Sequence, residues 1–122
     1  MQRIHYWLYL PKEITDVQEV FAKIFGVANF ERDYENVWEW ITGNSAWLGA
    51  NINIRREHDF NTGCYDAPLQ IGIDSEVKIS DSKKDEIGAK ICDELKTTVY
   101  LGSIVYGKGN DYECMVSKKY EK

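Results

Sequence analysis

The chain has 122 residues, of which 43% are hydrophobic and 29% are charged, and its formal net charge at pH 7 is −5. This length predicts one domain over residues 1–122, with a core that needs no metal or disulfide to be stable. The negative charge argues against nucleic-acid binding, which depends on a basic surface, and no apolar run is long enough for a membrane helix.

The N-terminus and the cysteines indicate a cytoplasmic protein. The first ten residues, MQRIHYWLYL, are too short and too polar for a signal peptide. Three cysteines, Cys64, Cys92 and Cys114, cannot all pair within one chain, and no two have the spacing of metal ligands. An odd number of cysteines is typical of a reducing compartment. We therefore expect a cytoplasmic protein without a metal or another cofactor.

A strand and a helix are predicted at the start of the chain. Residues 4–10 are apolar at most positions, which is typical of a central strand covered on both faces. Apolar residues at helical spacing then predict a helix over residues 15–26. A capping box at Thr15 would begin this helix, and Gly26 would end it in the left-handed conformation.

Residues 30–54 contain the strongest local pattern in the chain. Aromatic and β-branched residues flank the sequence TGNS at residues 42–45, which predicts an antiparallel hairpin with its turn there. Apolar and polar residues alternate over residues 47–54, so one face of that strand should be buried and the other exposed. Residues 55–66 show no periodicity and are predicted to form a loop.

The rest of the chain repeats this architecture. The predicted elements are a strand at residues 69–73, a helix that begins at Ser80 or Ser82, strands at residues 97–106 and 112–116, and a frayed charged tail at residues 117–122. The element order is therefore β-α-β-β-β-α-β-β. It predicts an α+β fold, a two-layer sandwich of ferredoxin-like type with two helices on one face of a mainly antiparallel sheet.

The predicted loop contains the strongest candidates for catalytic chemistry. A histidine can lower the pKa of a neighbouring thiol, so His58 and Cys64 could form a nucleophilic pair. However, no motif supplies an orienting third group or an oxyanion loop. Asp59 and Asp66 would add oxygen ligands, but the spacing matches no known metal site. We expect no enzyme, and retain as an alternative a small enzyme or ligand-binding domain that uses residues 55–66.

Acidic and aromatic residues concentrate in the hairpin and the segment after it. Tryptophan and tyrosine anchor the centres of protein interfaces, and surrounding charges set the rate and specificity of encounter. The same carboxylates could instead be a solvated strand face without a function. As a binding surface, the predicted partner-contacting residues are Glu31, Asp33, Tyr34, Glu35, Trp38, Glu39, Trp40, Trp47, Asp59 and Tyr65.

Over its full length the chain resembles the small immunity proteins that bacteria encode beside contact-dependent and other polymorphic toxins. The resemblance rests on the short acidic chain, the opening MQRIHYWLYLPKE, the aromatic-acidic segment EWITGNSAW, and the lack of a catalytic motif or export signal. It implies an antitoxin that binds a cognate toxin protein, often a basic nuclease, in the cytosol and inhibits it stoichiometrically. A regulatory protein that mimics DNA by its charge is a third interpretation.

Overall fold

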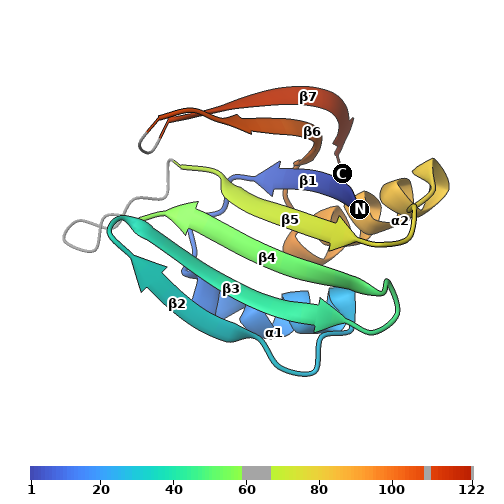
Figure 1. Cartoon of the computed structure of the whole chain (residues 1–122), viewed down its shortest axis with the longest axis horizontal. Coiled ribbons are helices and arrows are strands. Elements are labelled where there is room, and N and C mark those ends of the chain that lie inside the picture. The colour runs from blue at the N-terminus through green and yellow to red at the C-terminus, as the bar shows by residue number, and fades with distance from the viewer. Residues whose placement is uncertain (59–66, 109–110, 122) are drawn as a thin grey trace.

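The computed structural model describes residues 1–58, 67–108 and 111–121, and within them the chain has an α+β fold with two helices and one seven-stranded antiparallel sheet (Figure 1). The elements are β1 (Gln2–Leu8), α1 (Ile14–Phe25), β2 (Glu31–Glu35), β3 (Trp38–Ser45), β4 (Ala50–Glu57), β5 (Leu69–Ser75), α2 (Asp81–Leu95), β6 (Val99–Tyr106) and β7 (Tyr112–Tyr120). Across the sheet the strand order is β2-β3-β4-β5-β1-β6-β7. No helix in the described ranges has the length and apolar character of a membrane span.

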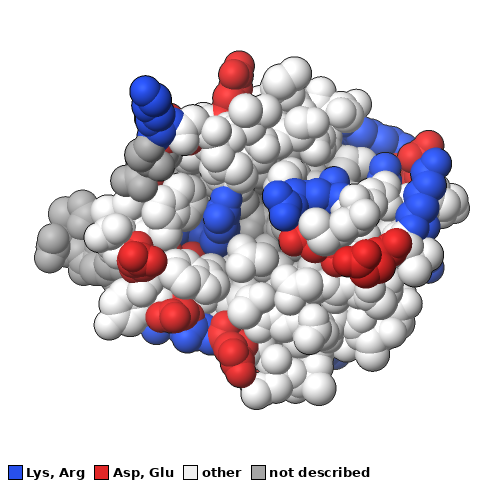
Figure 2. Space-filling model, viewed as in Figure 1, with Lys and Arg blue, Asp and Glu red and all other residues white. Residues whose placement is uncertain are grey.

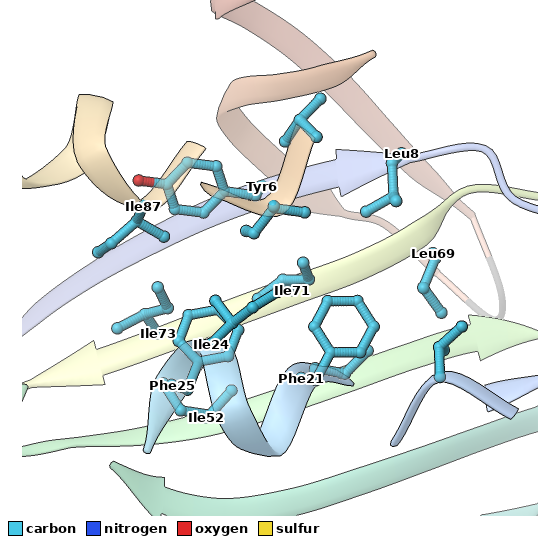
Figure 3. Packing of buried hydrophobic residues seen from close by; sticks show 14 of the residues in the cluster. Tyr6, Leu8, Phe21, Ile24, Phe25, Ile52, Leu69, Ile71, Ile73 and Ile87 are labelled. Carbon is cyan, nitrogen blue, oxygen red and sulfur yellow. The ribbon is translucent and has the colours of Figure 1, made fainter. Parts of the chain in front are cut away.

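One hydrophobic core contains residues from both helices and from the central strands. In α1 the predicted apolar stripe is buried, and Figure 3 shows Phe21, Ile24 and Phe25 beside the strand residues Ile52 and Ile71. Fully burying a side chain of this size stabilises a fold by about 1.5–3 kcal/mol. The core therefore fixes which face of each central strand points inward.

The helix ends follow the predictions in part. The capping box at Thr15 is wrong, because Thr15 already lies inside α1 and the extended residue before the helix is Glu13, whose side chain makes no capping hydrogen bond. Gly26 has the expected left-handed conformation, with φ at 62°. Ser80 caps α2, since its Oγ accepts a hydrogen bond from the backbone N–H of Lys83 at 3.2 Å.

The predicted hairpin is a three-stranded meander, so the chain has one more strand than expected. Asn36, with φ at 56°, reverses the chain between β2 and β3. The turn predicted at residues 42–45 is wrong: β3 continues through them, and the chain turns at residues 46–49 instead. A Cβ on Gly43 would lie 2.5 Å from the side chain of Val27, so this glycine serves close packing and not a turn.

Two other segments predicted to be irregular continue as strands. Residues 55–57 belong to β4. The alternation of buried and less buried residues along this strand continues through them, and Arg56 follows Ile52 and Ile54 on the buried face. The rest of that predicted loop lies outside the described residues. The predicted frayed tail continues β7 as far as Tyr120. Lys118 and Tyr120 hold it in place, each donating a hydrogen bond to Asp85 of α2.

The β6–β7 hairpin leaves the plane of the sheet. β6 pairs with β1 only through residues 100–102, and beyond this point it pairs with β7 alone. A β-bulge begins at Gly102, where a Cβ would lie 2.0 Å from the backbone oxygen of Met115. The rings of Trp38 in β3 and Tyr112 in β7 meet edge to face at 6.0 Å, although strands this far apart in the order would be about 24 Å apart in a flat sheet. The sheet is therefore strongly curled at this end.

Candidate binding groove

The strand side chains that alternate with the core residues form a second face of the sheet, which we call the open face. It carries Trp38 and Trp40 from β3, Asn53 and Arg55 from β4, Gln70 and Gly72 from β5, and Arg3 and His5 from β1. The arched hairpin places Tyr106 against it. Two adjoining hollows of about 190 and 620 Å³ result, and Arg3, Arg55 and Tyr106 line both. We call the two hollows together the groove.

The larger hollow has aromatic walls and an acidic margin. In the register of β2 and β3, Glu35 lies opposite Trp38 and Asp33 opposite Trp40, and directly paired residues share one face of a sheet. Glu31 extends the same row along β2, which is exposed at every position. Figure 2 shows acidic side chains along the margin where Figure 1 has β2, and basic side chains nearer the middle of the sheet. Five predicted partner-contacting residues thus lie together.

The other predicted contact residues lie elsewhere. Tyr34 and Glu39 are paired with each other on the opposite side of β2 and β3. Tyr34 is 60% exposed, whereas Glu39 is 2% exposed and is not available to a partner protein. Trp47 lies in the turn after β3, at the opposite end of that strand from Trp38. Asp59 and Tyr65 lie outside the described residues.

Glu39 belongs to an ion-pair network on the core side of the sheet. Its Oε2 accepts a hydrogen bond from Nη2 of Arg32 at 3.1 Å, and its Oε1 lies 3.9 Å from Nη2 of the fully buried Arg56. The two terminal nitrogens of Arg56 donate to the backbone carbonyls of Leu10 and Lys12 at 2.9 and 2.7 Å. This network ties the segment after β1 to β4, so its role is structural.

Three possible metal ligands lie at the edge of this network. Oxygen and nitrogen atoms of Glu13, Glu39 and His58 lie within 4.8 Å of one another. Two arginines already balance the charge of Glu39, and His58 Nε2 lies 3.2 Å from a carboxylate oxygen of Glu13, within hydrogen-bond distance, so contacts among protein side chains account for the cluster. The predicted pairing of His58 with Cys64 has no described geometry, because Cys64 lies outside the described residues. His58 itself is buried.

Arg55 is the central cation of the groove. Its guanidinium lies 4.3 Å from the ring centre of Tyr106 and 5.3 Å from that of Trp38, in cation–π geometry. Among the described residues, no carboxylate oxygen lies within 4.0 Å of it. Arg55 is therefore held in position by rings and keeps its charge available to a ligand.

The other polar groups of the smaller hollow are neutral or already paired. Arg3 donates to Asp74 at 2.7 Å. Burial lowers the pKa of His5 below its usual 6.5, and the nearby guanidinium groups of Arg3 and Arg55 lower it further. The hydroxyl of Tyr106 donates to Oε1 of Gln70 at 2.6 Å. The net charge of the hollow is therefore positive at neutral pH.

Sequence reasoning did not identify Arg3, His5, Arg55 or Tyr106 as site residues. One signal was present for Arg55: extending the alternation of β4 by three residues would have placed Arg55 beside Asn53 on the open face. Comparison with known proteins adds nothing to this geometry, because no family model, no curated protein and no solved structure matches the chain. The function is therefore inferred from the groove itself.

Proposed function

We propose that this protein is an antitoxin: it binds a basic, nuclease-type toxin protein through the larger hollow of the groove and its acidic margin, and inhibits it stoichiometrically, without catalysing a reaction. One observation carries the proposal. The register of β2 and β3 sets Glu31, Asp33 and Glu35 beside Trp38 and Trp40 on one face. Indole rings bury large areas at interface centres, and carboxylates beside them pair with lysine or arginine of a partner.

The charges of the chain support a basic partner. The net charge of −5 would attract such a protein over long range, and the carboxylates of β2 are exposed at the edge of the sheet, where they would be met first. An antitoxin has to outlast any leak of active toxin, so we expect a Kd near 1 nM, or about −12 kcal/mol. An interface of about 800 Å² per partner is sufficient. The proposal includes a cytoplasmic location, where a toxic nuclease would act.

We further propose that the fold is a two-layer sandwich of ferredoxin-like type with both helices on one face. The elements β1, α1, β4, β5, α2 and β6 follow the order β-α-β-β-α-β, and their strands are contiguous in the sheet. The single core that both helices share supports this assignment. On this interpretation β2–β3 and β7 are additions at the two edges, and β2–β3 carries the partner surface.

Co-expression with any toxin domain encoded beside this gene tests the proposed function. We expect the pair to survive, to co-purify and to elute as a 1:1 complex whose toxin is inactive. A triple variant, Glu31→Gln with Asp33→Gln and Glu35→Gln, should slow association about tenfold at low salt and much less at high salt.

A matched triple variant controls for net charge. Glu19, Asp93 and Glu94 are exposed on the two helices, and changing them to glutamine removes the same charge from a different surface. This control should alter association much less than the β2 triple variant. Equal slowing by both triples would contradict the proposed docking surface, and failure of the pair to form a complex would contradict the antitoxin function.

A further inference from the structure

We infer that the smaller hollow of the groove is a binding site for a carboxylate group, held by the guanidinium of Arg55 and the side-chain amides of Asn53 and Gln70. This inference goes beyond the proposed function, since it concerns a pocket in the free protein and does not require a toxin. All three residues line the hollow, whose volume of about 190 Å³ is enough for a small acid.

The electrostatic argument starts from Arg55. A half-buried guanidinium normally has an acidic partner, because leaving the charge uncompensated is costly. Arg3 in the same hollow is exposed and still pairs with Asp74, whereas the described surroundings of the half-buried Arg55 supply only the rings of Tyr106 and Trp38. A planar carboxylate matches the fork of nitrogen donors that an arginine held in this way presents.

Neutral donors complete the site. Gln70 is 1% exposed, its Oε1 accepts from Tyr106, and its Nε2 has no hydrogen-bond partner in the described part of the chain. A buried amide donor without an acceptor is unfavourable, so an acceptor in this hollow within hydrogen-bond distance of Nε2 would stabilise it. Asn53 offers a second amide from the neighbouring strand.

The charge balance favours a carboxylate over a phosphate. The hollow is lined by two arginines and one aspartate, and His5 adds no charge at neutral pH, so one positive charge is in excess. A singly charged carboxylate neutralises this excess, whereas a doubly charged phosphate exceeds it and would lie beside Asp74.

The hollow exists because β5 has a glycine in its floor. A Cβ on Gly72 would lie 3.8 Å from the backbone oxygen of Asn53 and 3.9 Å from His5, which is ordinary contact, and the backbone there is not left-handed. A larger side chain at this position therefore projects into the hollow without straining the strand. Gly72→Val fills the proposed site and suits a β-strand.

Titrating the isotope-labelled free protein with benzoate, while recording the side-chain ¹⁵N–H signals of Arg55 and Gln70, tests the inference. We expect saturable shifts of these signals at millimolar benzoate, and no saturable shift with benzamide, the neutral analogue. Arg55→Gln should weaken benzoate binding at least tenfold. Lys23→Gln, which removes an exposed cation from α1, should leave it unchanged.

Two further arms identify the ligand class and its source. Gly72→Val should abolish binding and Gly72→Ala should weaken it, with the melting temperature of each variant measured to establish that it is folded. Benzoate is then compared with a capped tripeptide that contains aspartate: tighter benzoate binding indicates a small free acid, and tighter peptide binding indicates a carboxylate of a partner protein. Equal binding of benzamide, tighter binding of phosphate, or no saturation at Arg55 and Gln70 would overturn the inference.

Discussion

Arg55 and Arg56 are consecutive residues of β4, and the alternation of the strand sends them to opposite faces of the sheet. Arg56 lies on the core side, is 0% exposed, and meets two backbone carbonyls and the carboxylate of Glu39. Arg55 lies on the open face between two aromatic rings and has no described carboxylate beside it. The two residues are both arginines of the same strand, yet they have no contact partner in common.

The comparison separates charged residues that hold the fold together from charged residues that are available to a ligand. The terminal nitrogens of the buried Arg56 are occupied by two carbonyls, and removing this residue would leave the buried charge of Glu39 poorly compensated. An arginine held by rings keeps its hydrogen-bond donors free for a ligand. The same contrast separates Glu39, which is buried beside two arginines, from Glu35, which lies exposed on the neighbouring strand.

The largest expected effect is on stability. Arg56→Met should lower the free energy of unfolding by about 3–5 kcal/mol, since it leaves Glu39 buried with only the partly exposed Arg32 as a counter-charge. Arg55→Met should change the free energy of unfolding by less than about 1 kcal/mol, because the cation–π contacts that it loses are offset by removal of a half-buried charge without a described carboxylate partner. Urea denaturation of both variants measures the contrast.

A double variant sharpens this comparison. Adding Glu39→Gln to Arg56→Met removes the buried negative charge that the single variant leaves behind, so the double variant should lose less stability than the sum of the two single variants. Equal losses for Arg55→Met and Arg56→Met, or strictly additive losses in the cycle, would show that the two faces do not differ in this way.

The next effect is on the proposed complex with a toxin. Trp40→Ala should raise the dissociation rate about 30-fold, because a central indole contributes about 2 kcal/mol or more to a protein interface. Trp47→Ala is the matched control, since Trp47 lies in the turn at the far end of β3 and packs beside Lys83 of α2. We expect it to leave the dissociation rate within about twofold. Surface plasmon resonance of both variants compares them, and a faster rate for Trp47→Ala alone would assign the interface to the other end of the sheet.

Features with a local physical cause could be predicted from the sequence. The stripe of α1, its end at Gly26 and the alternation of Ile52 and Ile54 all arise from spacing within one element, and all three predictions are confirmed. The acidic row beside Trp38 and Trp40 was also within reach, because the same short segment contains both strands that form it.

Features that depend on distant contacts could not be predicted in the same way. Gly43 resembles a turn residue until Val27 is found against it, and Arg56 looks like a loop residue until the carbonyls of Leu10 and Lys12 surround it. The approach of Tyr106 to Arg55 requires the whole hairpin to arch over the sheet, which no local pattern encodes. The groove was missed for this reason, although most of its aromatic residues had been noticed.

The smallest expected effect is a pH dependence of protein stability that arises from His5 on the open face. Burial and the charges of Arg3 and Arg55 lower the pKa of His5, and Asp74 opposes them only in part. The pKa of His5 is near 6.5 in the unfolded chain, so the folded protein binds a proton at His5 only at a lower pH than the unfolded chain does. The contribution of neutral His5 to the free energy of unfolding should therefore be fully present above pH 6.5. It should decrease as the pH falls from 6.5 to the lower pKa of His5 in the folded state. Melting temperatures measured between pH 7.5 and 5 should show this fall in the native protein and a smaller one in His5→Gln. A larger fall in His5→Gln would mean that the attraction of Asp74 outweighs both burial and the two arginines at His5, and the surroundings of His5 in the smaller hollow would then favour a cation.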